Sequence, residues 1–300
     1  MNELPIVVTC TDRKTHPPDP FLQARNLPET HLAGRVDHWA GHLAAARGAL
    51  RELADLYQGD QWHRAQALAG AATRAGFTPR LYVASAGLGL SPVSRPAPSY
   101  SATFAPRHAD SVASSITEAA DWWDHLQRLQ GAPNLSDLAG RHGGRILLVL
   151  SETYAQAMHR ELTVLAAEGY DSVLIGGARD IAGITRIPAN SGLRRALGGT
   201  LTSLNTRTAA AWLEHCTPGA LLTPAAMDRW NAWVEQTAVP ESYARTPMTD
   251  EEVIAFIREK CATLQPAPSR TRLLRMLRAD NKACEQKRFA DLYTRTMECR

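Results

Sequence analysis

A carboxylate and an amine follow the first apolar segment of the chain. Asp12 and Lys14, with Arg13 between them, come after Pro5–Cys10, a run typical of a buried strand. The neighbouring cations would keep Asp12 ionised, and a carboxylate can stabilise a positively charged sugar during glycosidic cleavage. A partly desolvated Lys14 could form a Schiff base with an opened sugar. Asp12 and Lys14 are therefore the candidate catalytic residues, although Asp12 is equally suited to a structural ion pair that caps a loop.

A second polar segment begins where the apolar run Arg80–Ala84 ends. Small residues there let backbone amides approach a ligand, hydroxyls can bond to it, and an aromatic ring can stack on it. Such a set suits a nucleobase extruded from a duplex; the alternative is a surface loop rich in glycine and proline. The glycine spacing matches neither a dinucleotide fingerprint nor a P-loop. The candidate ligand-binding residues of this segment are Ser85, Ala86, Gly87, Ser99, Tyr100 and Thr103.

Other polar residues lie close to predicted strand ends. In α/β folds, ligands bind beyond the carboxyl ends of the strands. Ser151 and Asn205 are equally suited to capping the helices that follow them, and Glu152 to complementing a helix dipole. Arg13 and Lys14 could also hold phosphates. The further residues assigned to substrate binding are Thr11, Arg13, Ser151, Glu152 and Asn205.

The composition gives no sign of a metal site, a cofactor site or a disulfide framework. The five cysteines include no Cys-x-x-Cys pair. His38 and His42 are four residues apart, but no Glu or Cys partner completes a metal set. We expect no metal, no cofactor and a reducing, cytoplasmic location. No apolar run approaches the roughly 18 residues of a membrane helix, so no membrane partner is expected.

Apolar runs that alternate with helical patterns predict the elements that position these residues. The predicted strands are Pro5–Cys10, Arg80–Ala84, Arg145–Leu150, Ser172–Ile175, Ile184–Ala189 and Thr200–Leu204. The predicted helices are His31–Leu56, Trp62–Ala75, Glu118–Leu129, Ser151–Glu168, Thr206–His215 and Pro224–Glu235. This alternation predicts an α/β fold, with a mostly parallel sheet flanked by helices and a helical C-terminal segment.

The positions of prolines and helix-capping residues predict three parts of the chain. We expect an α/β catalytic domain over 1–216, a helical, proline-rich connector over 217–248 and a basic helical segment over 249–300. A capping box from Thr249 to Glu252 predicts the first helix of the last part. Two more helices are expected at Ser269–Arg278 and Lys282–Thr296, hinged at Ala279-Asp-Asn281.

The basic excess of the chain lies in its last tenth. Residues 269–300 hold nine Lys or Arg against four Asp or Glu, whereas the whole chain has a net charge of only +3. Two short helices with one basic face resemble a helix-turn-helix, and their charges suit contact with phosphates. The alternative is a solvated amphipathic terminus. The residues assigned to DNA binding are Arg272, Arg275, Arg278, Lys282, Lys287 and Arg288.

Three motifs in the first 110 residues resemble those of little-characterised bacterial α/β domains. Those domains open with Cys-Gly-x-x-Lys and carry Ser-Ala-x-x-Gly-Leu followed by Pro-Tyr-x-x-Thr. The matching residues are Cys10 and Lys14, then Ser85, Ala86 and Leu90, then Ser99, Tyr100 and Thr103. Thr11 stands where the pattern has glycine. The group is distantly associated with base-exchanging tRNA and DNA transglycosylases.

The whole arrangement, including its basic C-terminus, is similar to an antiphage DNA glycosylase family. That family excises glucosylated hydroxymethylcytosine from phage DNA and leaves abasic sites. The resemblance implies a DNA glycosylase whose partner is double-stranded phage DNA with modified bases. Two alternatives remain open: a transglycosylase or nucleoside-processing enzyme, and a DNA-binding regulator whose α/β domain senses a small molecule.

Overall fold

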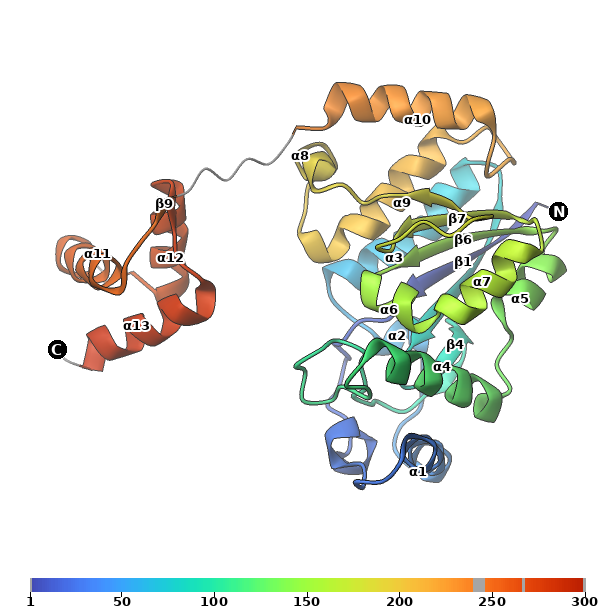
Figure 1. The fold of residues 1–300 in the computed structure, drawn as a ribbon, viewed down its shortest axis with the longest axis horizontal. Helices are drawn as coiled ribbons and strands as arrows, with labels where there is room; N and C mark the ends of the chain where they lie inside the picture. Colours follow the sequence, from blue (N-terminus) through green and yellow to red (C-terminus); the bar gives the residue numbers. More distant parts are fainter. Residues whose placement is uncertain (1, 240–245, 266–267, 299–300) are drawn as a thin grey trace. The chain divides into compact units, whose positions relative to one another are not determined.

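The chain forms two units in a computed structural model that describes residues 2–239, 246–265 and 268–298. The first unit spans Met1–Val239 and the second Pro240–Arg300 (Figure 1). Each unit has a hydrophobic core of its own. Across the described residues, no helix combines the length and the apolar character that a membrane span requires.

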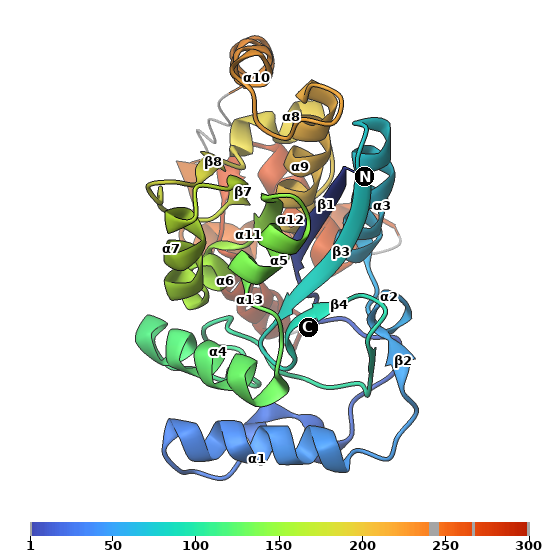
Figure 2. The same ribbon diagram turned by 90° about the vertical axis from the view of Figure 1, so that its right-hand side faces the viewer.

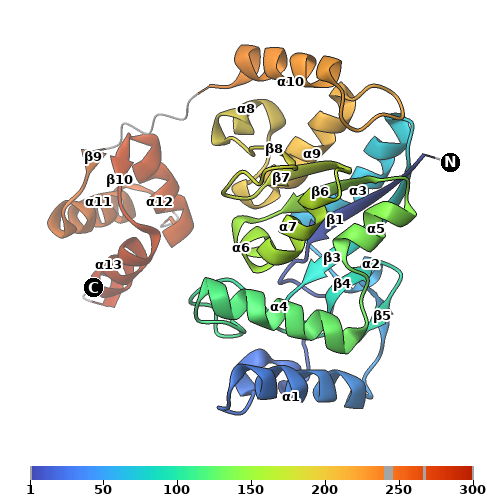
Figure 3. The same ribbon diagram turned by 45° about the vertical axis from the view of Figure 1, so that its right-hand side comes forward.

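A six-stranded sheet forms the centre of the first unit (Figure 3). All neighbouring strands are parallel except β3 and β4, so the predicted α/β fold with a mostly parallel sheet is confirmed. Because the strands are parallel, β1, β3, β6 and β7 end at one edge of the sheet. The strand order is β4 (Gly89–Pro92), β3 (Thr78–Ser85), β1 (Glu3–Thr9), β6 (Arg145–Leu150), β7 (Asp171–Gly176) and β8 (Thr185–Ile187).

Helices cover both faces of this sheet. On one face α3 and α9 pack against each other, and α5, α6 and α7 lie on the other (Figure 3). Helices α1 and α4 lie side by side beyond β4 (Figure 2). The helices of this unit are α1 (Leu32–Ala45), α2 (Leu53–Leu56), α3 (Asp60–Arg74), α4 (Ile116–Gln130), α5 (Leu135–Arg141), α6 (Glu152–Ala157), α7 (His159–Ala167), α8 (Arg194–Leu197), α9 (Leu204–His215) and α10 (Pro224–Thr237).

The strands are apolar because the sheet is covered on both sides. From Leu4 to Thr9 every residue of β1 is buried, and so is every residue of β6 after Arg145. Large aromatic side chains fill the space between sheet and helices, since each removes a large apolar area from water. The fully buried tryptophans of the first unit are Trp39, Trp62, Trp122, Trp123 and Trp212.

Three predicted elements of the first unit are wrong. The predicted strand Thr200–Leu204 is instead a 3₁₀ turn over Leu201–Ser203 that leads into α9. The Ser203 hydroxyl donates to the Thr200 carbonyl within this turn. The predicted helix His31–Leu56 ends at Ala45 and is followed by β2 (Arg51–Glu52), which pairs with β5 (Pro96–Ala97), and then by α2. The predicted helix Ser151–Glu168 is two helices, because the backbone leaves helical geometry at Met158.

The boundary between the units lies at Val239, not at the expected positions 216 and 248. Helix α10 packs on α9 and belongs to the first unit. Its Trp230 ring lies 5.8 Å from Trp212 and 5.6 Å from His215. This aromatic contact gives the predicted connector the same core as the α/β domain.

The second unit contains three helices around a small apolar core. The Thr249 capping box is present at the start of α11 (Asp250–Thr263), as predicted. Helix α12 covers Arg270–Ala279, and the predicted turn follows it, with Asn281 at a φ of 55°. The third helix begins later than predicted, as α13 (Gln286–Glu298), because β10 (Lys282–Ala283) pairs with β9 (Thr246–Pro247) instead of being helical.

Candidate functional site

The carboxyl ends of three strands bring the first and second sequence motifs together. The Cys10 amide, just after β1, donates to the Ala84 carbonyl of β3 at 3.0 Å. The Ser151 amide, just after β6, donates to the Thr9 hydroxyl at 3.0 Å. This edge therefore places Cys10, Ser85 and Ser151 on adjacent strands, where α/β folds bind ligands.

Tyr100 is the centre of a buried hydroxyl cluster at this edge. Its hydroxyl bonds Ser85 Oγ at 2.6 Å and also the hydroxyl of Tyr57. Ser85 Oγ in turn accepts from the amides of Gly87 and Leu88 at 3.1 and 3.2 Å. The Tyr100 side chain is 0% exposed, so its ring offers no open face to a base. The stacking role expected of Tyr100 is therefore not available in this conformation, because the ring is itself part of the core.

Lys14 lies against this cluster. Its ammonium is 4.4 Å from the centre of the Tyr100 ring and 5.8 Å from that of Tyr57. Burial lowers the pKa of Lys14, and the nearby charges of Asp12 and Asp110 only partly oppose that effect. A lysine in this setting has more neutral amine at pH 7 than an exposed lysine, and the neutral amine is the nucleophile.

Tyr154, one turn into α6, closes the cluster on its other side. Its hydroxyl lies 3.0 Å from Cys10 Sγ and accepts from the Ala86 amide at 3.2 Å. The Phe104 ring packs edge-on against it at 5.1 Å. Burial raises the pKa values of Tyr154 and Tyr57, so both stay protonated and act as hydrogen-bonding groups. Sequence reasoning missed both, because helices α6 and α2 bring them in from distant positions.

A cavity of about 310 Å³ opens beside Lys14. Its volume falls at the lower end of the roughly 300–1,000 Å³ typical of small-molecule sites. Asp12 stands at its rim with a side chain that is 66% exposed. The cavity thus brings together both candidate catalytic residues. Its lining consists of Asp12, Lys14, Thr15, His16, Pro17, Pro18, Tyr100 and Ser101.

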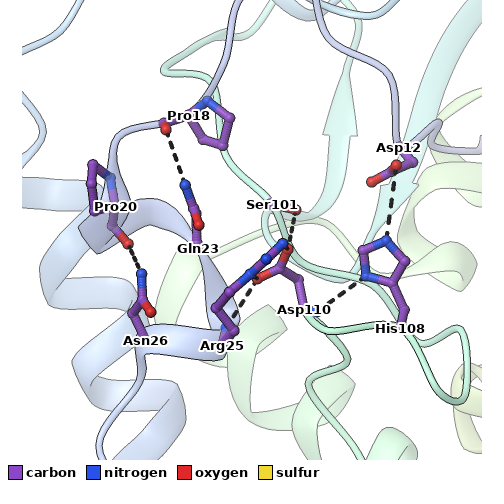
Figure 4. A network of polar contacts seen from close by, with 9 residues as sticks. All are labelled: Asp12, Pro18, Pro20, Gln23, Arg25, Asn26, Ser101, His108 and Asp110. Carbon is purple, nitrogen blue, oxygen red and sulfur yellow. Dashed lines mark hydrogen bonds and ion pairs between the residues drawn. The ribbon is translucent and has the colours of Figure 1, made fainter.

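A charged network beside the cavity holds the loop that follows β5 (Figure 4). The buried carboxylate of Asp110 accepts from Arg25 Nε at 2.8 Å, from the Arg25 amide at 3.0 Å and from Ser101 Oγ at 2.7 Å. Burial alone would raise the pKa of Asp110, but these hydrogen bonds outweigh it and lower the pKa to about 2. No sequence motif pointed to Asp110 or Arg25, which are 85 residues apart in the chain.

The same network orients a histidine toward Asp12. His108 Nδ1 accepts from the Asp110 amide at 3.1 Å, so the proton of the neutral ring is on Nε2. His108 Nε2 lies 4.0 Å from Asp12 Oδ2, which is too long for a direct hydrogen bond (Figure 4). His108 Nε2 and Asp12 thus face each other as a donor and an acceptor without bonding, and of the two only Asp12 lines the cavity.

Several sequence-predicted binding residues form the wall of the site instead of facing the cavity. The carbonyls of Ala86 and Gly87 accept from the buried indoles of Trp122 and Trp39, each at 2.8 Å. Ser99 Oγ donates to the His16 carbonyl at 2.7 Å, which fixes the cavity loop. Thr103 Oγ1 accepts from the Ala105 amide within a turn. These groups are occupied by the protein itself, so their contribution is to positioning.

Among the residues predicted at the other strand ends, Ser151 has the capping role considered as its alternative, whereas Asn205 has a structural role other than capping. The Ser151 hydroxyl caps α6. Asn205 Nδ2 donates to the Leu150 carbonyl at 2.8 Å and ties α9 to β6. Glu152 is exposed and bonds Gln156 in the next turn, while Thr11 is buried and Arg13 is exposed beside Gly59. None of the five is among the residues that line the cavity beside Lys14.

The predicted DNA-binding residues all lie in the second unit. Helix α12 carries Arg272, Arg275 and Arg278, β10 carries Lys282, and α13 carries Lys287 and Arg288. Arg288 is held by Asp250 at the start of α11, with Nε 2.7 Å and Nη2 2.5 Å from the carboxylate. Arg288 is therefore already paired with a carboxylate, whereas no ion pair holds Arg275 or Arg278 among the residues that the structure describes.

Among the described residues, no three His, Cys, Asp or Glu side chains are grouped so that they could hold a metal ion. Comparison of the chain with protein-family models, with curated proteins and with solved structures finds no match.

Proposed function

We propose that this protein is a DNA glycosylase that removes a modified cytosine from phage DNA and leaves an abasic site. The modification we propose is a glucosylated hydroxymethyl group, in keeping with the family that the sequence resembles. The observation that carries the proposal is Lys14, an amine with a lowered pKa, in a cavity that also holds the carboxylate of Asp12. An amine and a carboxylate at one cavity match the needs of reactions at the anomeric carbon of a sugar.

In the proposed reaction, the bond between the sugar C1′ and the base nitrogen breaks and its electron pair leaves with the base. The sugar becomes oxocarbenium-like, and the Asp12 carboxylate stabilises the positive charge. A water bonded to both Asp12 and His108 Nε2, which are 4.0 Å apart, would supply its oxygen to C1′. The proton released by this water passes to Asp12. The target nucleotide must leave the stack to reach the cavity.

Lys14 offers a second fate for the sugar. Its neutral amine can condense with the C1′ aldehyde of the opened sugar, forming an imine and releasing water. Borohydride would reduce that imine to a stable amine. A covalent adduct between protein and DNA after borohydride treatment would therefore place Lys14 on the reaction path, and its absence would leave water as the nucleophile.

The test is base release from phage DNA that contains glucosylated hydroxymethylcytosine, compared with unmodified DNA. Free base is scored by mass spectrometry and abasic sites by alkaline cleavage. We expect release from the modified DNA alone. The variant Asp12→Asn should lower the rate by about 10²–10⁴-fold while DNA binding persists, because its amide cannot take the proton. The matched control is Asp37→Asn. The Asp37 carboxylate lies 3.1 Å from His125 Nε2, and neither residue lines the cavity.

The alternatives make different predictions in the same assay. Full activity of Asp12→Asn would remove that carboxylate from the mechanism. Release from RNA or free nucleosides, but not from duplex DNA, would indicate a transglycosylase or a nucleoside-processing enzyme. DNA binding without release from any substrate would favour a non-enzymatic regulator.

A further inference from the structure

A basic groove lies between α12 and α13 of the second unit. Its volume is about 800 Å³. Four cations line it, together with a single carboxylate, that of Glu285. We refer to these cations as the groove cations; they are Arg270, Arg275, Arg278 and Lys287.

The helical repeat explains why these cations gather on one side. On α12, Arg270 lies one turn before Leu274, and Arg278 lies one turn after it. Leu273 and Leu277, between them in sequence, point into the core and are 0% exposed. The apolar face therefore anchors α12 and leaves its basic face open.

Within the described residues 246–265 and 268–298, the side chains of the groove cations make no hydrogen bond or ion pair, although the Glu285 carboxylate interacts electrostatically with Arg278 and Lys287. Arg288 differs, because Asp250 holds it and joins α13 to α11. Arg272 and Lys282 are not among the residues that line the groove. Four close cations beside a single carboxylate leave a net positive charge of +3 in the groove, and an anionic ligand would relieve their mutual repulsion.

The lining distinguishes between kinds of nucleic acid. Proteins that bind single strands combine cations with aromatic side chains on which bases stack. The groove has one aromatic residue in its lining, Phe289, and it is 0% exposed. A groove with cations and no accessible ring favours the phosphate backbone of a duplex.

We propose that the groove binds the phosphate backbone of duplex DNA through Arg270, Arg275, Arg278 and Lys287. Compared with the DNA-binding residues assigned from the sequence, this proposal adds Arg270 and omits Arg272, Lys282 and Arg288. The inference takes its partner, DNA, from the proposed function, but it does not depend on the glycosylase reaction.

Glu285 limits the strength of this contact. Its carboxylate accepts from the amides of Lys287 and Arg288, at 2.9 and 2.8 Å, and so occupies the amides at the start of α13. A phosphate must then bind the side chains of the groove beside a negative charge. Replacing this carboxylate by an amide removes the charge and keeps an acceptor for one of the two backbone amides, since each of them bonds a different carboxylate oxygen.

The test measures the affinity of the full chain for an unmodified DNA duplex across a series of salt concentrations. Each phosphate contact contributes about 0.9 to the slope of log K against log salt. We expect the double variant Arg275→Gln, Arg278→Gln to lower the slope by about 1.8. Adding Arg270→Gln and Lys287→Gln should bring the loss to about 3.6. The variant Glu285→Gln should bind more tightly than the unchanged protein at every salt concentration.

The matched control is Arg258→Gln, Arg295→Gln, which removes two exposed cations of the same unit that do not line the groove. Its slope should not change. The proposal would be overturned if the slope fell equally in the groove and control double variants, or if it fell in neither. Stronger binding to single strands or to duplex RNA than to duplex DNA would also overturn it. Circular dichroism verifies that each variant is folded. The two proposals can fail separately. If the groove variants lose DNA binding but the unchanged protein releases no base, the groove is the DNA-binding site and the glycosylase proposal is refuted.

Discussion

Asp110 is buried and Lys14 is partly buried, with opposite consequences for their protonation. Asp110 receives hydrogen bonds from Arg25 and Ser101, so its charged form is favoured and its pKa is about 2. Lys14 has the faces of two aromatic rings and no bonded carboxylate, so burial prevails and its pKa falls. Asp110 holds a loop in place, and Lys14 is the amine of the proposed reaction.

Burial of the Lys14 charge has a cost in stability that depends on pH. The folded pKa lies below the value of about 10.4 of an unfolded lysine. The cost is therefore fully present below the folded pKa and disappears as the pH rises toward that unfolded value. We expect Lys14→Met to have a higher Tm than the unchanged protein at neutral pH, with a difference that shrinks at alkaline pH. Thermal unfolding of both proteins across this pH range measures it. A lower Tm for Lys14→Met at neutral pH would contradict the prediction.

Among individual residues, those directly after predicted strands could be found from the sequence. Residues that distant segments bring to the site could not. Asp12 and Lys14 follow the first apolar run directly, and they do meet at one cavity. Tyr154 and Cys10 are 144 residues apart and touch because α6 begins just after β6, the strand that pairs with β1. No local pattern reports such a contact, so the buried tyrosines could not have been predicted.

The turn from β3 to β4 is built around Tyr100. A Cβ atom at Gly87 would lie 2.5 Å from one ring carbon of Tyr100 and 2.6 Å from another. Glycine at this position therefore leaves room for the Tyr100 ring, and the ring in turn contacts the Lys14 ammonium. The motif that sequence reasoning assigned to base contact is thus required for the packing of the site.

A single added methyl group should disturb this element. We expect Gly87→Ala to destabilise the protein by about 1–3 kcal/mol, because the buried Tyr100 ring must move. Gly41→Ala is the matched control: Gly41 lies in α1 with nothing within 4 Å of the added Cβ. It should be neutral or stabilising by up to about 1 kcal/mol, since alanine favours helix. Urea unfolding compares the two, and equal effects would mean that the ring adapts freely.

Elements with long apolar runs were predicted well, and short or mixed ones were not. The runs in β1, β6 and β7 are buried on both sides and were all found. Strand β4 begins at Gly89 and ends at Pro92, residues that are uncommon in strands, and its pairing with β3 is what makes it a strand. Thr200–Leu204 has the composition of a strand but no neighbour to pair with, so it forms a turn and starts α9.

The whole molecule consists of two units with separate apolar cores. The second core contains Leu273, Leu277 and Phe289, all 0% exposed, and it shares no residue with the first. The concentration of basic residues after position 269 was visible in the sequence. The boundary at Val239 was not, because prolines suggested a connector where aromatic packing of Trp230 holds α10 on the first unit.

Separate cores predict separate responses to a core substitution. Leu277→Ala should destabilise the second unit by about 2–5 kcal/mol, because it leaves a cavity in a small core. Amide hydrogen exchange should then speed up in α11, α12 and α13 while β1 and β6 keep their protection. The reverse pattern is expected for Leu148→Ala in β6, whose side chain is also 0% exposed. Faster exchange throughout the chain in either variant would show that the two units unfold together.

The lowered pKa of Lys14 also makes the protein accessible to selective chemistry. Lys14 is the single lysine in the first 259 residues, and the other three are Lys260, Lys282 and Lys287. Acylating reagents attack neutral amines, so a mild reagent at neutral pH favours Lys14, whose pKa burial lowers, over Lys260, whose pKa the hydrogen bond to Glu259 raises. A fluorophore attached in this way would sit at the mouth of the cavity and report its occupancy directly, without an engineered cysteine. The environment that lowers the pKa of this amine thus provides a built-in labelling position.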